Sequence, residues 1–370
     1  MFFFPCFIVA TSCLEPYNPP AIKEVVDLLV VDGFLNASDS SVNVHLSKAL
    51  AISEDGSPQP ELHANVRVEE ENGIVYPLAE AGEGNYFLKK MDVDLSRRYR
   101  LYITTQNEKV YSSDFIDLPS SPAIDSITWK PGVQDEGIGI YVNTHDPLNK
   151  THYYQWTFEE TWEYTSGNFS SYKIQNGVVV PQDQNIYRCW TSRPSTEIHI
   201  GTSNQLNEDV IRDFQLMFIP IGSEKLFRKF SIEVQQRALT KDAYDFWLQL
   251  KKTTESLGGL FDPLPSQVLG NLRSSGGDSE PVLGYFSGGQ AVKKRIFISI
   301  VDLPRELRRL VPLFCPMDSI DVNSIASFPD MNLIASYGMP FIQGYFTSYE
   351  KNCVDCRDNG GDIVRPDFWE

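Results

Sequence analysis

Short stretches in which apolar and polar residues alternate dominate the first third of the chain and restrict it to β-structure. Val42, Val44 and Leu46 are separated by polar residues, which is the period of a strand with one buried face. Clusters of turn-forming residues, such as 71–73 and 82–85, interrupt these stretches. About seven such strands without helical periodicity predict an immunoglobulin-like β-sandwich over residues 25–118.

Two prolines and two serines in residues 119–123 predict a linker after this domain. Strands again predominate in residues 124–370. The expected fold class is therefore mainly β, an immunoglobulin-like β-sandwich followed by a larger β-rich domain with one or two helices. An amphipathic segment predicts a helix over residues 241–257, capped by Thr240. The apolar residues between 206 and 214 predict a second, shorter helix.

The first twelve residues carry no charge and are mostly apolar, and Cys13 follows them directly. A run of this length suits the core of a secretory signal peptide and is too short to span a bilayer. We therefore expect residues 1–12 to be a lipoprotein signal peptide, Cys13 to be lipidated, and the proline-rich residues 13–24 to form a tether. The alternative is a buried first strand with an ordinary cysteine.

Four further cysteines remain in the exported chain, and their even number predicts two disulfides. The candidates are Cys189, Cys315, Cys353 and Cys356. Their spacing leaves all three pairings open. Cys353 and Cys356 also have the CxxC spacing of a zinc site, but the sequence offers no second such pair, so disulfides are the favoured interpretation.

The chain carries 32 Lys and Arg against 49 Asp and Glu, a formal net charge of −17. This charge repels phosphate backbones, so we expect no nucleic-acid partner. The five histidines form no HExxH motif, and neither a GxSxG motif nor a phosphate-binding glycine loop occurs. We therefore expect no catalytic residue, no metal and no cofactor.

The segment from 152 to 164 is strongly aromatic and predicts a long strand. It carries Glu159, Glu160 and Glu163. Because glycosidases use paired carboxylates and aromatic rings stack on sugars, one hypothesis is a glycan-binding or glycan-hydrolysing surface here. The alternative, which we favour, is a sheet with core aromatics and charges at its edges. Glu160 lies on the same strand face as the aromatic residues, so we expect that face not to be uniformly buried.

Residues 165–186 are rich in Ser, Gly, Asn and Gln and predict an excursion at the edge of the sheet. Irregular segments on a rigid sandwich commonly carry function. We expect the aromatic residues around this excursion, Tyr164, Tyr172 and Tyr187, to form a surface that contacts a ligand or a partner.

Several segments together resemble an uncharacterised lipoprotein family of the Bacteroidota, domain of unknown function 4249. The residues that carry this resemblance are CLEPY from Cys13, HYYQWTFEETWEY from His152, Cys189-Trp190, the run from Ala243 to Asn271, Gly284-Tyr285-Phe286, and the C-terminal CVDCRDNGGDIVRPDFW. The resemblance extends over essentially the whole chain from Cys13 onward.

This resemblance implies a lipid-anchored outer-membrane protein at the periplasmic or cell-surface face. Members are often encoded near TonB-dependent receptors, which implies a non-enzymatic accessory or ligand-capture subunit of a TonB-dependent nutrient-uptake receptor. The triplet Asp-Ser-Ile occurs at residues 125–127 and 318–320 and resembles the O-glycosylation sites of these bacteria. Ser126 and Ser319 are therefore candidate glycosylation sites.

Overall fold

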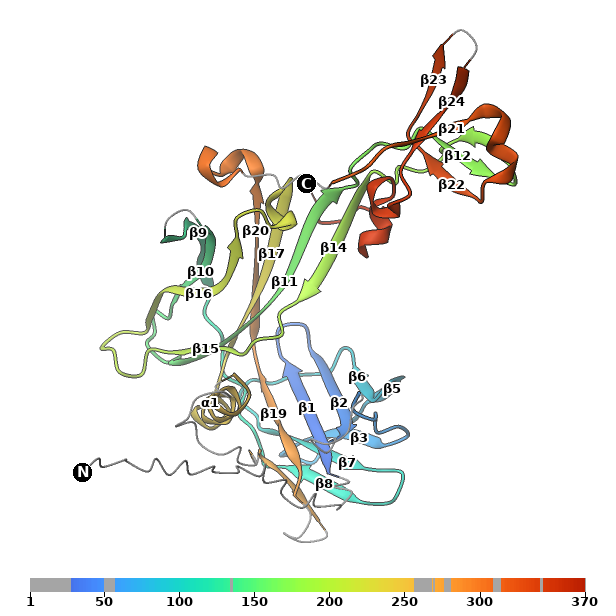
Figure 1. Ribbon diagram of the computed structural model, residues 1–370. Coiled ribbons are helices and arrows are strands. Elements are labelled where there is room, and N and C mark those ends of the chain that lie inside the picture. Colours follow the sequence, from blue (N-terminus) through green and yellow to red (C-terminus); the bar gives the residue numbers. More distant parts are fainter. Residues whose placement is uncertain are drawn as a thin grey trace, which may run out of the picture.

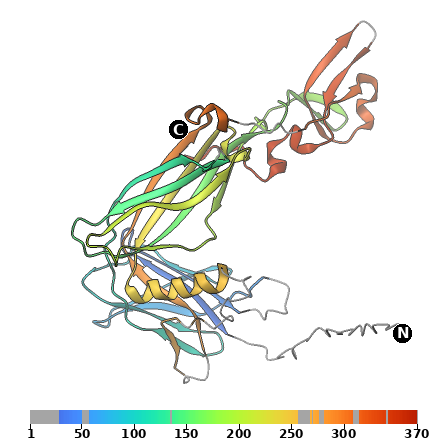
Figure 2. The ribbon, with the colours of Figure 1, turned by 60° about the vertical axis from the view of Figure 1, so that its left-hand side comes forward.

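The computed structural model describes residues 28–49, 57–133, 136–255, 268, 270–275, 281–308, 314–339 and 342–369. Three β-rich lobes follow one another along a long axis (Figure 1, Figure 2). We name them the first sandwich, the second sandwich and the distal lobe. Strands make up most of the regular structure, which confirms the mainly β fold class.

The first sandwich consists of two five-stranded sheets, with the orders β19-β1-β2-β6-β5 and β18-β8-β7-β3-β4. Their strands are β1 (Leu29–Asn36), β2 (Ser41–Lys48), β3 (Asn65–Glu70), β4 (Val75–Pro77), β5 (Ala79–Gly82), β6 (Asn85–Leu88), β7 (Tyr99–Thr104), β8 (Val110–Ser113), β18 (Leu272–Ser274) and β19 (Leu283–Gly289). Val42, Val44 and Leu46 are buried in the core between the sheets, as their alternation predicts.

Two strands from much later in the chain complete this sandwich. β19 pairs in parallel with β1, and β18 pairs with β8. The predicted division into residues 25–118 and 124–370 therefore needs correction, because β18 and β19 belong to the first sandwich. Gly284 permits the close approach of β19: its φ is +103°, and a Cβ there would lie 1.8 Å from the carbonyl oxygen of Val31.

The second sandwich packs a sheet of order β16-β10-β9 against one of order β14-β11-β17-β20, with β15 paired to β11. Its strands are β9 (Ile124–Pro131), β10 (Gly137–His145), β11 (Tyr153–Thr165), β14 (Arg188–Pro194), β15 (His199–Thr202), β16 (Val210–Pro220), β17 (Lys229–Ala238) and β20 (Ala291–Ser299). Trp156, Trp162 and Phe230 are fully buried in its core, so bulky aromatic side chains fill the space between the sheets.

The segment predicted as a short helix at 206–214 instead leads into β16, which corrects that prediction. β16 pairs with β10 through two register shifts. Each shift changes which residues face inward, so Ile211, Leu216 and Ile219 are buried without a regular period of two. This uneven spacing of apolar residues imitates helical periodicity.

The α-helix α1 (Lys241–Glu255) lies at the junction of the two sandwiches (Figure 2). Thr240 Oγ1 accepts a hydrogen bond from the Ala243 backbone N–H at 3.3 Å, which confirms the predicted cap. Ala243 and Phe246 are buried in one cluster with Ile200 of β15 and Tyr285 of β19. The helix therefore fastens the two sandwiches together; residues 256–257 of the predicted helix lie outside the described residues.

Within the described ranges, no helix is long and apolar enough to cross a membrane.

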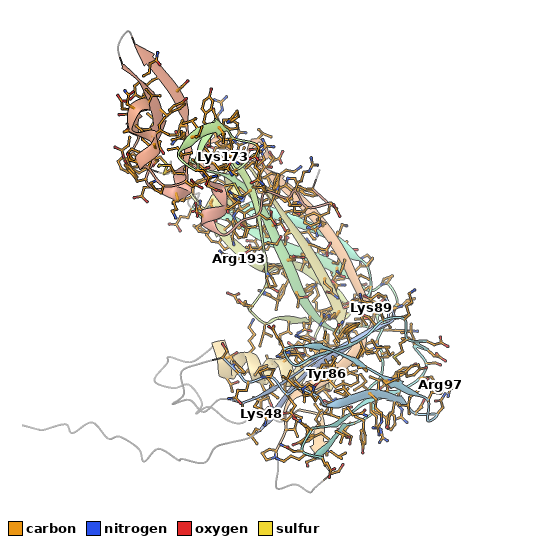
Figure 3. The ribbon with its side chains drawn as sticks, turned by 90° about the vertical axis from the view of Figure 1, so that its right-hand side faces the viewer. Lys48, Tyr86, Lys89, Arg97, Lys173 and Arg193 are labelled. Atoms are coloured by element: carbon orange, nitrogen blue, oxygen red, sulfur yellow. A yellow bond between two sulfur atoms is a disulfide. The ribbon has the colours of Figure 1, made fainter. Side chains whose placement is uncertain are left out.

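The distal lobe, residues 166–187, 314–339 and 342–362, contains two three-stranded sheets of order β13-β12-β22 and β21-β24-β23. Its strands are β12 (Tyr172–Gln175), β13 (Val178–Pro181), β21 (Asp318–Asp321), β22 (Met331–Leu333), β23 (Ala335–Met339) and β24 (Ile342–Thr347). The predicted excursion at 165–186 is thus the β12–β13 hairpin. Figure 3 shows the order along the molecule, with Arg97 on the first sandwich, Arg193 on the second and Lys173 on the distal lobe.

Short 3-10 helices connect the later strands. They are η2 (Glu224–Leu226), η3 (Ile300–Asp302), η4 (Arg305–Leu307), η5 (Val322–Ser327), η6 (Lys351–Cys353) and η7 (Cys356–Asn359).

Candidate binding sites

Glu160 of β11 is a buried, ion-paired carboxylate. Both of its oxygens accept hydrogen bonds from Lys225 Nζ at 2.7 Å. Lys225 comes from η2, which packs over the edge of the aromatic face of β11. As expected, this face is not uniformly buried, but its half-buried residue is Phe158 and not Glu160. Lys225 neutralises the Glu160 carboxylate and lets it be buried.

Glu163 has its own partners, separate from those of Glu160. Arg188 Nε lies 3.2 Å from its Oε1, and Trp369 Nε1 donates to its Oε2 at 3.3 Å. Glu159 is exposed and lies opposite Glu233 of β17. Both buried carboxylates thus have partners within the protein, and Glu163 holds Trp369 against β11. This arrangement favours the structural interpretation of the aromatic strand.

The four candidate cysteines form two disulfides, Cys189–Cys356 and Cys315–Cys353. The prediction of two disulfides is confirmed, and the pairing that the spacing left open is assigned. The two cysteines of the CxxC segment bind different partners, so neither is available to zinc. In the part of the chain that the structure describes, no group of three or more His, Cys, Asp or Glu side chains is placed to hold a metal ion.

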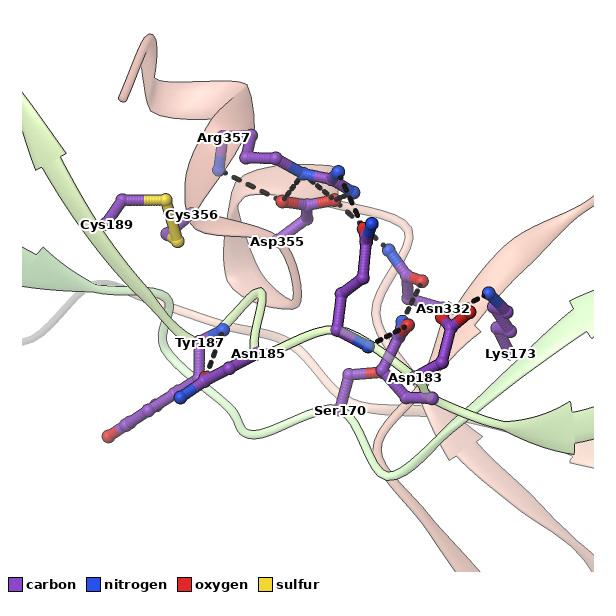
Figure 4. A network of polar contacts seen from close by, with 12 residues as sticks. Ser170, Lys173, Asp183, Asn185, Tyr187, Cys189, Asn332, Asp355, Cys356 and Arg357 are labelled. Carbon is purple, nitrogen blue, oxygen red and sulfur yellow. Dashed lines mark hydrogen bonds and ion pairs between the residues drawn. A yellow bond between two sulfur atoms is a disulfide. The ribbon is translucent and has the colours of Figure 1, made fainter. Parts of the chain in front are cut away.

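Asp355 and Arg357 form the centre of a polar network at the root of the distal lobe (Figure 4). Arg357 Nη2 lies 2.7 Å from Asp355 Oδ2, and Arg357 Nη1 donates to Gln184 Oε1 at 3.2 Å. Burial by itself would raise the pKa of Asp355, but the hydrogen bonds and charge of Arg357 outweigh burial and lower it. Sequence patterns did not single out this pair, although it adjoins the cysteines that anchor the lobe.

Tyr164 is buried in the core of the second sandwich, so its predicted place on a contact surface is wrong. Its hydroxyl donates to the carbonyl oxygen of Cys356 at 2.9 Å. The reason is the period of the strand: Tyr164 continues the row of core-facing residues that includes Trp162.

Tyr172 and Tyr187 are partly exposed on the distal lobe, where they were expected. Tyr172 packs edge-on against Tyr345 with a centroid distance of 5.5 Å, and Tyr187 packs edge-on against Phe169 at 5.8 Å. Aromatic pairs of this geometry hold each ring in place while leaving one edge accessible.

Large apolar side chains are exposed on the distal lobe. They are Phe169, Val178, Phe314, Met317, Val322 and Tyr349. Phe314 is 87% exposed and Phe169 is 56% exposed. Gly167 packs directly against the Cys315 sulfur, which brings the segments carrying these two phenylalanines together. Phe169 and Phe314, two exposed rings on adjoining segments, are therefore the candidates for an interaction surface on this lobe.

A buried cluster of Asp209, Tyr154 and Ser203 supports the turn before β16. The hydroxyls of Tyr154 and Ser203 each donate to one carboxylate oxygen of Asp209, and His152 Nδ1 lies 3.3 Å from Ser203 Oγ. Burial, followed by the hydrogen bond to Asp209, raises the pKa of Tyr154. The serine stands between the carboxylate and the imidazole, which is not the order of a serine hydrolase, where the histidine stands between them. Sequence patterns gave no sign of this cluster.

Of the three predicted modification sites, the structure describes the two serines but not Cys13. Cys13 and the predicted signal peptide and tether lie outside the described residues. Ser126 is partly exposed on β9, and Ser319 is exposed on β21. Both hydroxyl-bearing residues therefore lie at the surface of the protein.

Two β-sandwiches joined through a helix, with a disulfide-bonded distal lobe, define the class as a multi-lobed β-protein. The family described as a domain of unknown function, DUF4249, matches residues 14–295. Because this match spans well over half of the chain, the chain belongs to the DUF4249 family. The match ends before Cys315, so the part of the expected resemblance that lies beyond residue 295 stays a prediction. None of the curated proteins matches the chain.

Proposed function

We propose that this protein is a lipid-anchored outer-membrane protein that serves a TonB-dependent nutrient-uptake receptor as an accessory or ligand-capture subunit, without enzymatic activity of its own. The uncharged apolar run before Cys13 supports export and lipidation. The two disulfides support an oxidising compartment, since such bonds are rare in the cytosol.

The observation that carries the proposal is that the N-terminal end of the described chain and the distal lobe lie at opposite ends of the molecule. The β1–β2 turn adjoins the second sandwich, where Ser38 Oγ donates to the carbonyl oxygen of Ala291 at 2.7 Å. Leu29 begins β1 at the opposite end, about 25 Å away along an extended strand of eight residues. The distal lobe lies beyond the second sandwich (Figure 1, Figure 3).

Cys13 precedes Leu28, the first described residue, by 28 − 13 = 15 residues. A lipid on Cys13 therefore anchors the end of the first sandwich that is farthest from the distal lobe. The exposed apolar residues of the distal lobe then lie far from the anchored membrane surface. There they can contact the part of a membrane-embedded partner that projects out of the membrane. The partner surface in this proposal is the distal lobe.

The proposal is tested by purifying the tagged full chain from detergent-solubilised outer membranes. We expect a β-barrel receptor to co-purify in stoichiometric amount. A variant with Phe169→Asp and Phe314→Asp is expected to reduce the recovered receptor about tenfold or more, because it places charge at the contact. Leu148→Asp, at a 70% exposed position of the second sandwich, is the matched control and should leave recovery unchanged.

A chain that purifies without a barrel protein contradicts the receptor partnership. Equal losses in the distal-lobe variant and in the control contradict the assignment of the contact to the distal lobe.

A further inference from the structure

A cleft of about 970 Å³ lies on the outer face of the first sandwich, beside the second sandwich. Its floor is the face of β1, β2 and β6 that points away from the sandwich core. Figure 3 labels Tyr86 and Lys89, two of the residues that line it. Arg237 of β17 lines the cleft from the side of the second sandwich. The cleft is remote from the distal lobe and plays no part in the receptor contact proposed above.

Two rows of side chains cross the floor of the cleft. Strand register places Asp32 opposite His45, and His45 opposite Asn85. His45 Nδ1 lies 3.1 Å from Asn85 Oδ1. The second row consists of Phe34, Asn43 and Phe87. Because side chains two apart on a strand share a face, polar groups and aromatic rings are presented side by side to the cleft.

Arg237 reaches over this floor from the second sandwich. Its guanidinium carbon lies 3.9 Å from the centroid of the Phe34 ring, and its Nε is buried without a hydrogen-bond partner. Asp32 faces Arg237 and interacts with its charge, yet the contacts of the described residues include neither a hydrogen bond nor an ion pair between them. The acceptor-only carboxylate and the donor-only guanidinium are therefore separated by a gap and make no direct contact.

The side chain of Asp32 is open to the cleft, but the surrounding protein withdraws water from it. This desolvation raises the pKa of Asp32, while the charges of Arg237 and His45 act in the opposite direction. A hydrogen-bond donor that enters the cleft would replace part of the lost hydration.

A ligand that bridges this gap must donate hydrogen bonds to Asp32 and accept them from Arg237. A hydroxyl group does both. The side-chain amide of Asn43 can likewise donate a hydrogen bond to a ligand hydroxyl or accept one from it. The Phe87 ring is partly exposed and has Lys89 Nζ 5.8 Å from its centroid. It offers an apolar surface, which suits the C–H face of a sugar ring. An apolar ligand would leave these polar groups unpaired.

Charge narrows the ligand class further. The rim carries Lys89 and Lys90 as well as Asp39, and the interior carries one carboxylate and one guanidinium. Side chains of both charges thus line the cleft, which disfavours a strongly charged ligand of either sign. From the gap, the amides, the aromatic platform and this balance, we propose that the cleft binds a neutral oligosaccharide.

The test uses the purified full chain in detergent, without any receptor, so that its outcome is separate from that of the receptor partnership. The probes are gluco-, xylo-, manno- and malto-hexasaccharides, with an oligogalacturonate and inorganic phosphate as anionic probes. Binding is followed by calorimetry. We expect at least one neutral hexasaccharide to bind with a dissociation constant of about 1 mM or tighter.

Asp32→Asn and Asn43→Ala are each expected to weaken this binding by about tenfold, because each removes one hydrogen-bonding group from an exposed position of the floor. Asn107→Ala, at an exposed position of the β7–β8 turn, is the control and should bind like the unaltered chain. Thermal unfolding of all three variants shows that each is folded.

Three outcomes overturn the proposal. The first is no binding of any neutral hexasaccharide by the folded chain. The second is binding that Asp32→Asn and Asn43→Ala leave unchanged, which places the sugar elsewhere. The third is binding of the anionic probes alone, which makes the cleft an anion site.

Discussion

Replacing Cys189 and Cys356 together by alanine is expected to lower the free energy of unfolding by about 3–5 kcal/mol. This disulfide joins residues 167 positions apart and thereby closes nearly half of the chain into one loop. It also holds the segment around Cys356, whose backbone N–H donates to the Ile186 carbonyl oxygen at 2.9 Å. Without the bond, the C-terminal part of the distal lobe loses its covalent link to β14.

The matched control for this prediction is the double alanine variant of Cys315 and Cys353. That pair is only 38 positions apart, so its removal is expected to cost about 1 kcal/mol less. Denaturant unfolding followed by tryptophan fluorescence measures both variants, since Trp162 and Trp190 lie in the second sandwich near the Cys189 bond. An equal or smaller loss for the Cys189–Cys356 pair would contradict the account of the distal lobe's attachment.

Trp156→Ala is expected to lower the free energy of unfolding by about 3–5 kcal/mol. Trp156 is fully buried between the sheets of the second sandwich and packs on Phe214 with a centroid distance of 4.4 Å. Its Nε1 donates to Gln236 Oε1 at 2.9 Å. Gln236 in turn donates to the carbonyl oxygen of Pro122 at 2.9 Å, which ties the predicted linker to the core.

The alanine variant therefore leaves both a cavity and a buried amide oxygen without its donor. Trp156→Phe loses the hydrogen bond but leaves a smaller cavity, so its expected loss is about half as large. Equilibrium unfolding of the two variants distinguishes the contributions. A loss below about 1.5 kcal/mol for Trp156→Ala would show that the core collapses around the missing ring and would refute its central role.

Local periodicity was sufficient to predict many of the strands and one helix, although it mistook the start of β16 for a helix. The alternation of Val42, Val44 and Leu46 identifies both a strand and the face it buries, because period two is a property of the strand itself. The cap at Thr240 likewise depends on neighbouring residues only. The same rule applied to β11 would have placed Tyr164 in the core, since it shares a face with Trp162.

Local sequence patterns could not predict the features that join distant parts of the chain. Glu160 is buried because Lys225, 65 positions later, neutralises it. The pairing of β19 with β1, the choice among three disulfide pairings, and the position of Arg237 over Phe34 likewise depend on the folded chain. The oligosaccharide cleft is of this kind, because its floor and its wall come from different sandwiches.

Site-specific photo-cross-linking in cells tests the proposed role most directly. A photoreactive phenylalanine analogue is introduced in place of Phe314 on the distal lobe or, in a second strain, in place of Leu148 on the second sandwich. We expect the analogue at position 314 to cross-link to a β-barrel receptor and the analogue at position 148 to give no such product. A receptor cross-link from position 148 alone, or from neither position, would contradict a receptor contact through the distal lobe.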